Sequence, residues 1–480
     1  MLTTLALRNI GFDATCYDRG GGQEGSQSAP TIHRCASYSR IAFRPDVSHR
    51  RVLPLLLTRC FPSSRGLQIW PFALDALRSI DDTLADALLT HGDLLDVAVL
   101  RNARGDLLRT VDVSRPILAV SSDTVLDVLQ SRLPASAVVH GHTLETLEIT
   151  QSHRAEHGVL CVLDACGTGS RVGVPADILI GADGLRSRVR SQLHGQHESV
   201  VDAGSTAWRG RVKRSDVHAD LCPPGSSVYT CTPDGRTMWL TSLSTGHGAH
   251  GGFISWVLCA PSASEAGHER TPVVHGTDHK EPTSSEHRIL NWLTHRPTLS
   301  LQQARTVPRV EQRIRSTFHD FAAVPQLMAA TPAGSIVERR LFHRAAAHGA
   351  TPAAECGELA VDTSGRGPVT LVGDAQHMCL PSLGLGACLT IQGVATLMAT
   401  LDAVPPGSSR AAMEAALRQY ESKHLGFVAA TTTAALEQTN FVARMAPGTT
   451  IPDSGAAFQG WLLGNARRGG MAAAAHITGR

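Results

Sequence analysis

The sequence predicts a mixed α/β protein in which a three-layer α/β domain is interrupted by a β-rich domain and closed by C-terminal helices. Two short apolar segments, 177–180 and 369–372, each lead into a turn that contains glycine and then into a helix-like stretch. Strand, glycine turn and helix in succession are typical of an α/β sheet. Segments between them have the character of antiparallel strands, at 206–213, 226–232, 237–243 and 253–259.

Composition narrows the class of protein and of partner. Apolar residues make up 42% of the 480 residues and charged residues 18%, which excludes a charged disordered chain, a collagen and a coiled coil. The formal net charge is only +2, and no basic run is long enough to follow a phosphate backbone. We therefore expect a small-molecule substrate and no nucleic-acid partner. The sequence does not indicate an oligomeric state.

Targeting and cysteine patterns give further expectations. The apolar run Val52–Leu57 falls far short of the ~18 to 20 residues that span a bilayer, so no integral membrane segment is expected. Residues 1–15 lack the pattern of a signal peptide, and the 11 cysteines are not closely paired. We expect buried thiols in the cytoplasm, or in an organelle if a targeting segment precedes Met1. The 23 histidines include no HExxH, and no paired CxxC occurs, so no metal site is expected.

The first elements are a helix followed by a strand. Leu2, Leu5 and Ile10 lie near helical spacing, Gly11 suits the residue after a helix, and residues 12–17 form a short strand that ends at Asp18. In a nucleotide-binding βαβ unit, a first strand and a glycine-rich loop that binds pyrophosphate precede such a helix. The sequence starts with the helix, just beyond where that loop would lie.

Residues 20–65 have no sustained period, and we interpret them as an insertion or a disordered loop. Order returns at 66–71, and the apolar residues from Leu74 to Leu88 form one amphipathic helix stripe. A loop is expected at about 260–286. The remaining expected strands lie at 97–100, 107–113, 144–149 and 158–163, and the expected helices at 122–133, 288–293, 317–329, from 386, and 409–444.

Two turns carry the chemistry that the sequence suggests. Asp183 and Gly184 follow the strand at 177–180, and Gly373 and Asp374 follow the strand at 369–372. Open α/β sheets bind ligands at the carboxyl ends of their strands, where a carboxylate can accept hydrogen bonds from ribose or ribityl hydroxyls. The alternative is that both are ordinary turns with surface aspartate caps.

A second glycine pair follows the second turn. Pro381 stiffens the approach, and Gly384 and Gly386 let backbone amides come close to a ligand at the start of the next helix, with Leu385 between them. The partial positive charge of a helix N-terminus suits an electron-rich ring edge or an oxyanion.

These segments together resemble the flavin-dependent class A monooxygenases with the para-hydroxybenzoate hydroxylase fold. The turns at 183–184 and 373–386 resemble the family's two later cofactor motifs, and Asp18 falls on its ribose-binding acid. The other similar segments are 5–19, 67–77, 208–210 and 417–421.

The resemblance implies a Rossmann-like FAD-binding domain interleaved with a β-rich substrate domain. It implies FAD as cofactor and NAD(P)H as co-substrate, and it identifies no catalytic side chain. The implied domains are 1–205 (FAD-binding, first part, with the insertion at 20–65), 206–345 (substrate), 346–445 (FAD-binding, second part, and closing helix) and 446–480 (tail). The implied cofactor-binding residues are Asp18, Arg19, Asp183, Gly184, Gly373, Asp374, Pro381, Gly384, Leu385 and Gly386.

The implied activity is an NAD(P)H-dependent monooxygenase, an oxidoreductase that inserts one oxygen atom of O2 into a small molecule. Hydroxylation of an aromatic ring is the first choice, and epoxidation of an alkene, as in relatives of zeaxanthin epoxidase, is the second. NADH and NADPH both remain open. The alternative is a non-catalytic remnant, or an N-terminally truncated gene model, that binds FAD weakly or not at all.

The departures from the family bear on FAD affinity. No phosphate loop precedes the first helix, and Ser122 stands where an arginine usually helps to hold the diphosphate. Phe72 replaces an asparagine, Leu385 a glutamine, and Gln392-Gly393 a Glu-Asp pair. Charge-assisted hydrogen bonds contribute about 1.5–3 kcal/mol each, so the loss of several would weaken binding by orders of magnitude.

Other side chains have a structural and a functional interpretation. His377 beside Asp374 is either a general base or, as we favour, a structural residue. Arg186, Arg188 and Arg190 either meet a dinucleotide phosphate, one of them at best, or solvate a helix face.

Overall fold

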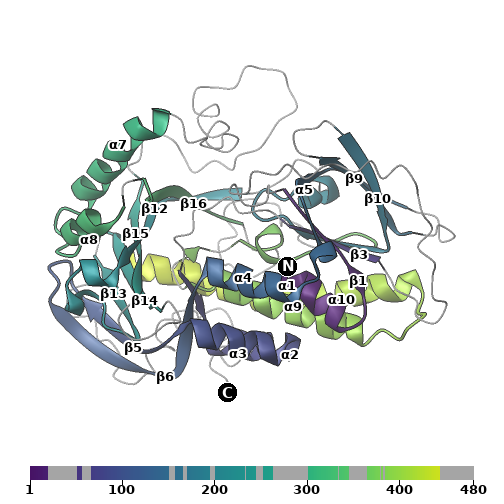
Figure 1. Ribbon diagram of the computed structural model, residues 1–480, viewed down its shortest axis with the longest axis horizontal. Helices are drawn as coiled ribbons and strands as arrows, with labels where there is room; N and C mark the ends of the chain where they lie inside the picture. Colours follow the sequence, from purple (N-terminus) through teal and green to yellow (C-terminus); the bar gives the residue numbers. More distant parts are fainter. Residues whose placement is uncertain are drawn as a thin grey trace, which may run out of the picture.

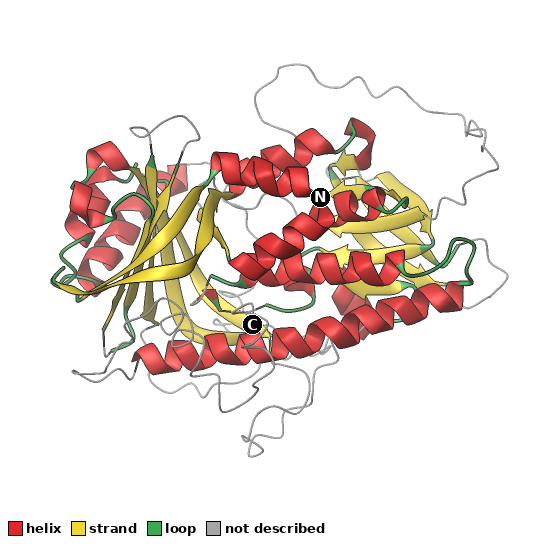
Figure 2. Ribbon diagram, turned by 90° about the horizontal axis from the view of Figure 1, so that it is seen from below, coloured by secondary structure: helices red, strands yellow, loops and turns green. Residues whose placement is uncertain are grey.

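The computed structural model confirms the mixed α/β class and consists of two sheet-based regions joined by long helices (Figures 1 and 2). Among the described residues, no helix is both long and apolar enough to cross a membrane. The structure describes residues 1–19, 51–56, 66–150, 157–165, 170–194, 200–232, 234–244, 252–262, 301–332, 334–344, 365–378, 380–381 and 384–443.

The first region is built on a parallel sheet with the strand order β17-β11-β3-β2-β7, and β1 also pairs with β3. All of its described pairings are parallel. The carboxyl ends of its strands therefore share one edge. Its strands are β1 (Asp13–Ala14), β2 (Cys16–Asp18), β3 (Arg51–Leu56), β7 (Val138–His140), β11 (Ile178–Ala182) and β17 (Val369–Leu371).

Strand β3 corrects one expectation. Residues 51–56 belong to the segment expected to be an irregular insertion, but they form a strand between β2 and β11, in register Asp18↔Leu56 and Ile178↔Val52. The position beside the second strand is where a nucleotide-binding unit has its first strand. Local sequence patterns did not reveal this strand, because a proline stands at position 54 and the partner strands are far away along the sequence. The rest of the expected insertion lies outside the described residues.

Two further layers cover the parallel sheet, as expected for a three-layer domain. A smaller antiparallel sheet with the order β10-β9-β8 packs against one face through Leu163, Leu179 and Val369. Helices α1, α9 and α10 pack against the other face through Leu7, Ile180 and Leu397. These elements are β8 (His142–Ile149), β9 (Val159–Ala165), β10 (Ser170–Ala176), α1 (Leu2–Asn9), α9 (Gly386–Asp402) and α10 (Arg410–Ala443).

The second region is an eight-stranded sheet with the order β16-β12-β15-β14-β13-β5-β6-β4. Its core-facing side packs on helices α7 (Leu301–Thr317) and α8 (Val324–Ala330), where Trp208, Leu240 and Trp256 meet Phe318 and Phe321. Its strands are β4 (Gly66–Ile69), β5 (Asp93–Arg101), β6 (Leu107–Ser121), β12 (Val200–Lys213), β13 (Ser226–Cys231), β14 (Thr237–Leu243), β15 (Phe253–Pro261) and β16 (Val337–Arg344).

This sheet combines strands from both of the expected domains. Strands β4, β5 and β6 lie within the expected first domain, 1–205, yet they extend the sheet of the expected substrate domain, 206–345. The reason is a long-range parallel pairing of β5 with β13, in register Ala98↔Ser227, which no local pattern reveals. Strand β16 also has no counterpart among the expected strands, and the expected helix at 317–329 is confined to α8 and the end of α7.

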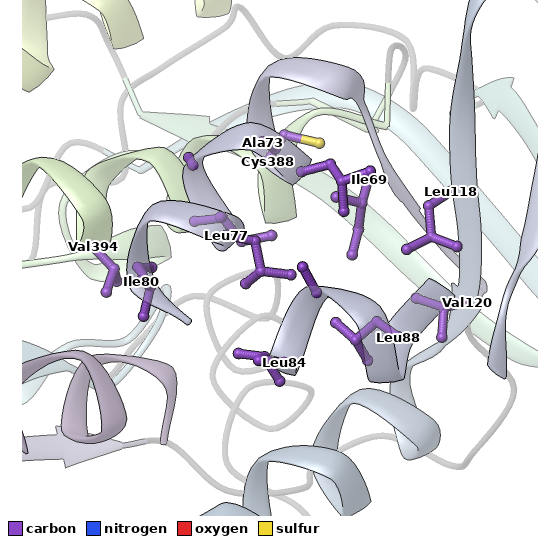
Figure 3. Close-up of a cluster of buried hydrophobic side chains, with 14 of the residues drawn as sticks. Ile69, Ala73, Leu77, Ile80, Leu84, Leu88, Leu118, Val120, Cys388 and Val394 are labelled. Atoms are coloured by element: carbon purple, nitrogen blue, oxygen red, sulfur yellow. The ribbon is translucent and has the colours of Figure 1, made fainter. Parts of the chain in front are cut away.

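Helices α2 (Pro71–Ile80), α3 (Asp82–His91) and α4 (Ser122–Arg132) connect the two regions. The single stripe expected from Leu74 to Leu88 is divided between α2 and α3, because Asp81 ends one helix and accepts a hydrogen bond from Leu84 N to cap the next. Figure 3 shows their shared core. Its labelled residues are Ile69, Ala73, Leu77, Ile80, Leu84, Leu88, Leu118, Val120, Cys388 and Val394.

The remaining described elements are short: α5 (Arg188–His194), η1 (Ala135–Ala137), η2 (Arg214–Asp216), η3 (Ala219–Leu221) and η4 (Gly373–Ala375). The long helices expected from 386 and over 409–444 are confirmed as α9 and α10. The expected helix at 288–293, most of the expected loop at 260–286 and the expected tail at 446–480 lie outside the described residues.

Candidate functional site

Three of the predicted segments meet at the carboxyl edge of the parallel sheet. Asp18 ends β2, Asp183 follows β11, and Asp374 follows β17. Strand β3 lies between β2 and β11, so Asp18 and Asp374 are three strand spacings apart, which corresponds to about 14 Å.

Asp18 and Arg19 lie at one end of this edge. The Asp18 carboxylate is 3.1 Å from His140 Nδ1, at the end of the neighbouring strand β7. The Arg19 side chain is exposed. This end of the edge therefore presents charged and hydrogen-bonding groups next to solvent.

Asp183 is turned toward the protein. Only 7% of the residue is exposed, and its Oδ2 accepts hydrogen bonds from Arg188 N at 2.6 Å and Val189 N at 3.2 Å. Burial raises the pKa of this carboxyl. Gly184 beside it has a φ of +74°, which lets the chain turn tightly before α5. Asp183 therefore caps the N-terminus of α5.

Two of the three arginines after this turn contact backbone carbonyls. Arg188 donates to Leu144 O at 2.7 Å. Arg190, 1% exposed, donates to Ala375 O and Gln376 O, both at 3.4 Å. Arg190 thereby ties α5 to the turn after β17, which differs from the expectation of a phosphate contact or a solvated helix face.

The turn after β17 places Asp374 at the surface. Gly373 has a φ of +60°, and a Cβ there would lie 3.1 Å from Thr390 Oγ1 of α9. Gln376 N and His377 N both donate to Gly373 O, which closes the turn. Asp374 itself is exposed. This carboxylate is therefore accessible to a ligand.

A buried polar cluster supports this turn from behind. Tyr420 of α10 donates from its hydroxyl to Leu371 O at 3.1 Å and lies 3.0 Å from Gln376 Oε1. His424 Nε2 is 3.1 Å from His377 Nε2, and the His424 ring stacks on Tyr420. Burial and the neighbouring His377 lower the pKa of His424 well below its usual value.

Gly393 makes this histidine pair possible. A Cβ at Gly393 would lie 2.7 Å from His424 Nε2, so any larger residue would displace the ring. The Gln392-Gly393 departure noted in the sequence therefore creates the space that His424 fills. His377, which is 5% exposed, accordingly packs against His424 behind the turn.

The second glycine pair forms a tight turn before α9. Gly384 N donates to Pro381 O at 2.9 Å, and Gly384 has a φ of +65°. Leu385 is fully buried in the core under α9, which begins at Gly386. The amides at this helix start are accordingly next to Gly384.

The Gly384 turn meets the second sheet on its polar face. Along β13 and β14, Val228 and Leu240 point to the core under α7 and α8, so their neighbours point the opposite way. A Cβ at Gly384 would lie 3.4 Å from Gln68 Oε1 and 3.6 Å from Trp239 Cη2. The polar face carries Gln68, Arg209, Ser227, Tyr229, Trp239, Thr241 and Ser255.

The sequence analysis did not identify these polar-face residues. The alternation within 226–232 and 237–243 was visible, and it could have separated Ser227, Tyr229, Trp239 and Thr241 from the core. Gln68 gave no such signal. It reaches the polar face only because β4, the last strand in the sheet order, lies across β13 and β14 in space.

Comparisons with known proteins agree with this geometry. A profile of the FAD binding domain family matches residues 346–435, which include the turns at Gly373 and Gly384 and about three quarters of α10. The solved structure of HpxO from Klebsiella pneumoniae, complexed with FAD and uric acid, has a TM-score of 0.59 and 17% sequence identity, covering 89% of this chain and 90% of that one. The resemblance to the class A flavin monooxygenase family is confirmed.

Two curated relatives extend the likeness to this monooxygenase family along the sequence. Zeaxanthin epoxidase from Spinacia oleracea is 26% identical over 349 residues, covering 70% of this chain but only 41% of the epoxidase. Aurachin C monooxygenase/isomerase from Stigmatella aurantiaca is 24% identical over 372 residues, covering 74% of each chain. The chain thus spans well under half of the epoxidase and about three quarters of the aurachin enzyme.

Proposed function

We propose that this chain binds FAD at the carboxyl edge of its parallel sheet and uses NAD(P)H and O2 to oxygenate a small aromatic or alkene substrate. The observation that carries the proposal is the contact of the Gly384 turn with Gln68 and Trp239. At this contact the start of α9 meets the polar face of a second sheet. A ring-shaped cofactor and its substrate could be held next to this contact.

The residues present fit FAD in three respects. Gly373 and Gly384 both have positive φ, so the chain approaches this edge without a Cβ in the way. Asp374 is exposed next to Gly373 and could accept hydrogen bonds from ribityl hydroxyls. Asp18, about 14 Å along the same edge, could do the same for ribose. The extended shape of FAD matches acceptors that are spread along an edge in this way.

FAD, when bound, supplies the redox chemistry, and the chain's own residues bind, orient and exclude water. The amides at the start of α9 lie in the partial positive field of a 17-residue helix, which favours an electron-rich ring edge. Tyr229 and Trp239, with ring centroids 5.0 Å apart, provide an aromatic wall opposite that helix start. A flat substrate would lie against this wall.

The relatives support aromatic hydroxylation and epoxidation alike. They include an epoxidase, a monooxygenase/isomerase and a solved 2,6-dihydroxypyridine-3-hydroxylase from Arthrobacter nicotinovorans with a TM-score of 0.57. Hydroxylation of an aromatic ring remains our first choice because Tyr229 and Trp239 form the wall.

The experiment is reconstitution of the purified full chain with FAD. We expect a stoichiometric flavin spectrum after removal of free FAD, followed by NADH or NADPH oxidation that consumes O2 and accelerates with a suitable aromatic substrate. A folded protein that stays colourless in excess FAD would overturn the proposal and support the alternative of a non-catalytic remnant.

A further inference from the structure

A row of partly accessible side chains crosses the polar face of the second sheet. Arg209, Val257, Trp239 and Tyr229 pair in register across β12, β15, β14 and β13. All four are half-buried, whereas the residues on either side of them in each strand are buried. Trp239 is the member of this row that the Gly384 turn meets. The row therefore offers a ligand an accessible surface that leads away from that turn.

Arg209 is the charged member of this row. Its Nε is buried, and in the part of the chain that the structure describes no residue accepts a hydrogen bond from its guanidinium or forms an ion pair with it. Burial lowers the pKa of Arg209, but an arginine keeps its charge at neutral pH. A partly buried charge without a counterion is unfavourable. An anionic ligand would supply the acceptor that the described protein does not.

The charges around Arg209 give this face a cationic character. The strands from β16 to β13 in the sheet order contain two acids, Asp202 and Glu338, and each forms an ion pair with another arginine. Arg339 of β16, which is opposite Ala207, points to the same face as Arg209. Two guanidinium groups on one face, with both acids of these described strands already paired, favour a ligand that carries negative charge.

We propose that Arg209 binds a carboxylate of the substrate, so that the substrate of the proposed oxygenation is a small aromatic or alkene acid. This rests on the proposed function and narrows its substrate class. The planar guanidinium can hold a carboxylate through two parallel hydrogen bonds. Two strand spacings, about 10 Å, separate Arg209 from Trp239. An acid bound at Arg209 therefore has its apolar part over Val257 and reaches toward the Gly384 turn.

The test titrates the full chain, saturated with FAD, with matched acid and amide probes by calorimetry. The pairs are benzoate with benzamide and 2-naphthoate with 2-naphthamide, which share a ring and differ in charge. We expect the wild-type chain to bind the acid of at least one pair about tenfold more tightly, because a hydrogen bond to a charged group contributes more than one to a neutral group. Equal affinities within both pairs, or no binding of any probe, would overturn the proposal.

Variants of Arg209 assign the preference to this side chain. Arg209→Met should abolish it, and Arg209→Lys, which keeps the charge but not the planar fork, should retain part of it. Arg211→Met is the matched control and should keep the preference. Arg211 lies on the same face of the same strand, with its guanidinium carbon 4.4 Å from the centroid of the Phe253 ring. A preference that survives Arg209→Met but is lost in Arg211→Met contradicts the assignment to Arg209.

A measurement without ligand separates binding from a structural part. Because no described residue accepts from Arg209, Arg209→Met should leave the denaturant midpoint of the FAD-free chain unchanged or raise it. A clear fall of the midpoint would reveal a structural partner and overturn the proposal. The wild-type comparison of acids with amides needs no variant, so a poorly folded Arg209→Met leaves that comparison intact.

FAD affinity distinguishes the cofactor from the substrate as the partner of Arg209. A fall in FAD affinity in Arg209→Met, together with equal acid and amide affinities in the wild type, would assign Arg209 to the cofactor and overturn the proposal. A wild-type chain that binds no FAD at all refutes the proposed function instead. The same probe pairs, titrated into the FAD-free chain, then decide whether Arg209 binds a carboxylate, with equal or absent binding against it.

Discussion

Asp183 and Asp374 lie after neighbouring strands of one sheet, each beside a glycine with positive φ, and yet they end in different environments. Asp183 is buried and caps α5 through Arg188 N and Val189 N, whereas Asp374 is exposed. The difference comes from the segment after each turn. The amides at the start of α5 donate to the Asp183 carboxylate, whereas the amides after Gly373 donate to Gly373 O instead. The same short pattern therefore serves structure in one turn and leaves the carboxylate exposed in the other.

The largest expected effect separates the two aspartates by ligand affinity. Asp374→Ala should weaken FAD binding ten- to a hundredfold, because a charged acceptor contributes about 1.5–3 kcal/mol, while the free energy of unfolding changes by less than about 0.5 kcal/mol. Fluorescence titration and denaturant unfolding measure the two quantities. Asp402→Ala, exposed at the end of α9, is the control. FAD affinities that are equal in the two variants would remove Asp374 from the site.

The next effect concerns the support behind the Asp374 turn. Gly393→Ala should lower the free energy of unfolding by about 1–3 kcal/mol, because its methyl group would overlap the buried His424 ring. Gly426→Ala is the matched control on α10, where a Cβ meets nothing within 4 Å, and it should stabilise the chain by about 0.5–1 kcal/mol through helix propensity. Changes of the same sign in both variants would contradict the close packing at Gly393.

The same substitution at Asp183 should affect stability where that at Asp374 affects FAD affinity. Asp183→Ala removes a helix cap and should cost about 1–2 kcal/mol of unfolding free energy, while Asp183→Asn, which keeps a side-chain acceptor, should cost less. Thermal unfolding in the absence of FAD checks this. An FAD affinity that falls more in Asp183→Ala than in Asp374→Ala would reverse the assignment of structural and ligand-binding parts.

The smallest effect is a pH dependence from the histidine pair. Burial lowers the pKa of His424, so as pH falls below about 6.5 the unfolded chain takes up the proton first. Stability is then lost on acidification, at up to about 1.4 kcal/mol per pH unit for one proton. Denaturant midpoints at about pH 7.5 and about pH 5.5 should differ less in His424→Gln than in the wild type. An unchanged difference would place the titrating group elsewhere.

Elements set by local chemistry were predictable from the sequence. Gly11 ends α1 with a φ of +89°, and the apolar face of 386–402 gives α9. The turns at 183–184 and 373–374 were also located correctly, since an apolar strand followed by glycine and aspartate is a local signal. The six cysteines that the structure describes are free, and they are buried or half-buried, as their scattered spacing suggested.

Features that depend on distant pairing were not predictable. The place of β3 between β2 and β11 depends on strands about 38 and 126 residues away along the chain. Whether Asp183 points inward depends on the position of α5 in space, and Gln68 becomes a site candidate only because β4 lies across β13 and β14. Periodicity within a single segment contains none of this information.

The bridge that Cys388 makes between Gln68 O and the Trp70 amide has a chemical consequence. A thiol in that position is buried, and burial raises its pKa to about 12, so at neutral pH it remains the protonated, poorly nucleophilic form. Cys161 and Cys231 share this property, with pKa values also raised to about 12. Because oxidants attack the thiolate, these three sulfur atoms should resist sulfenic acid formation in a protein proposed to handle O2. The contact that joins β4 to α9 is thus chemically durable in addition to being well packed.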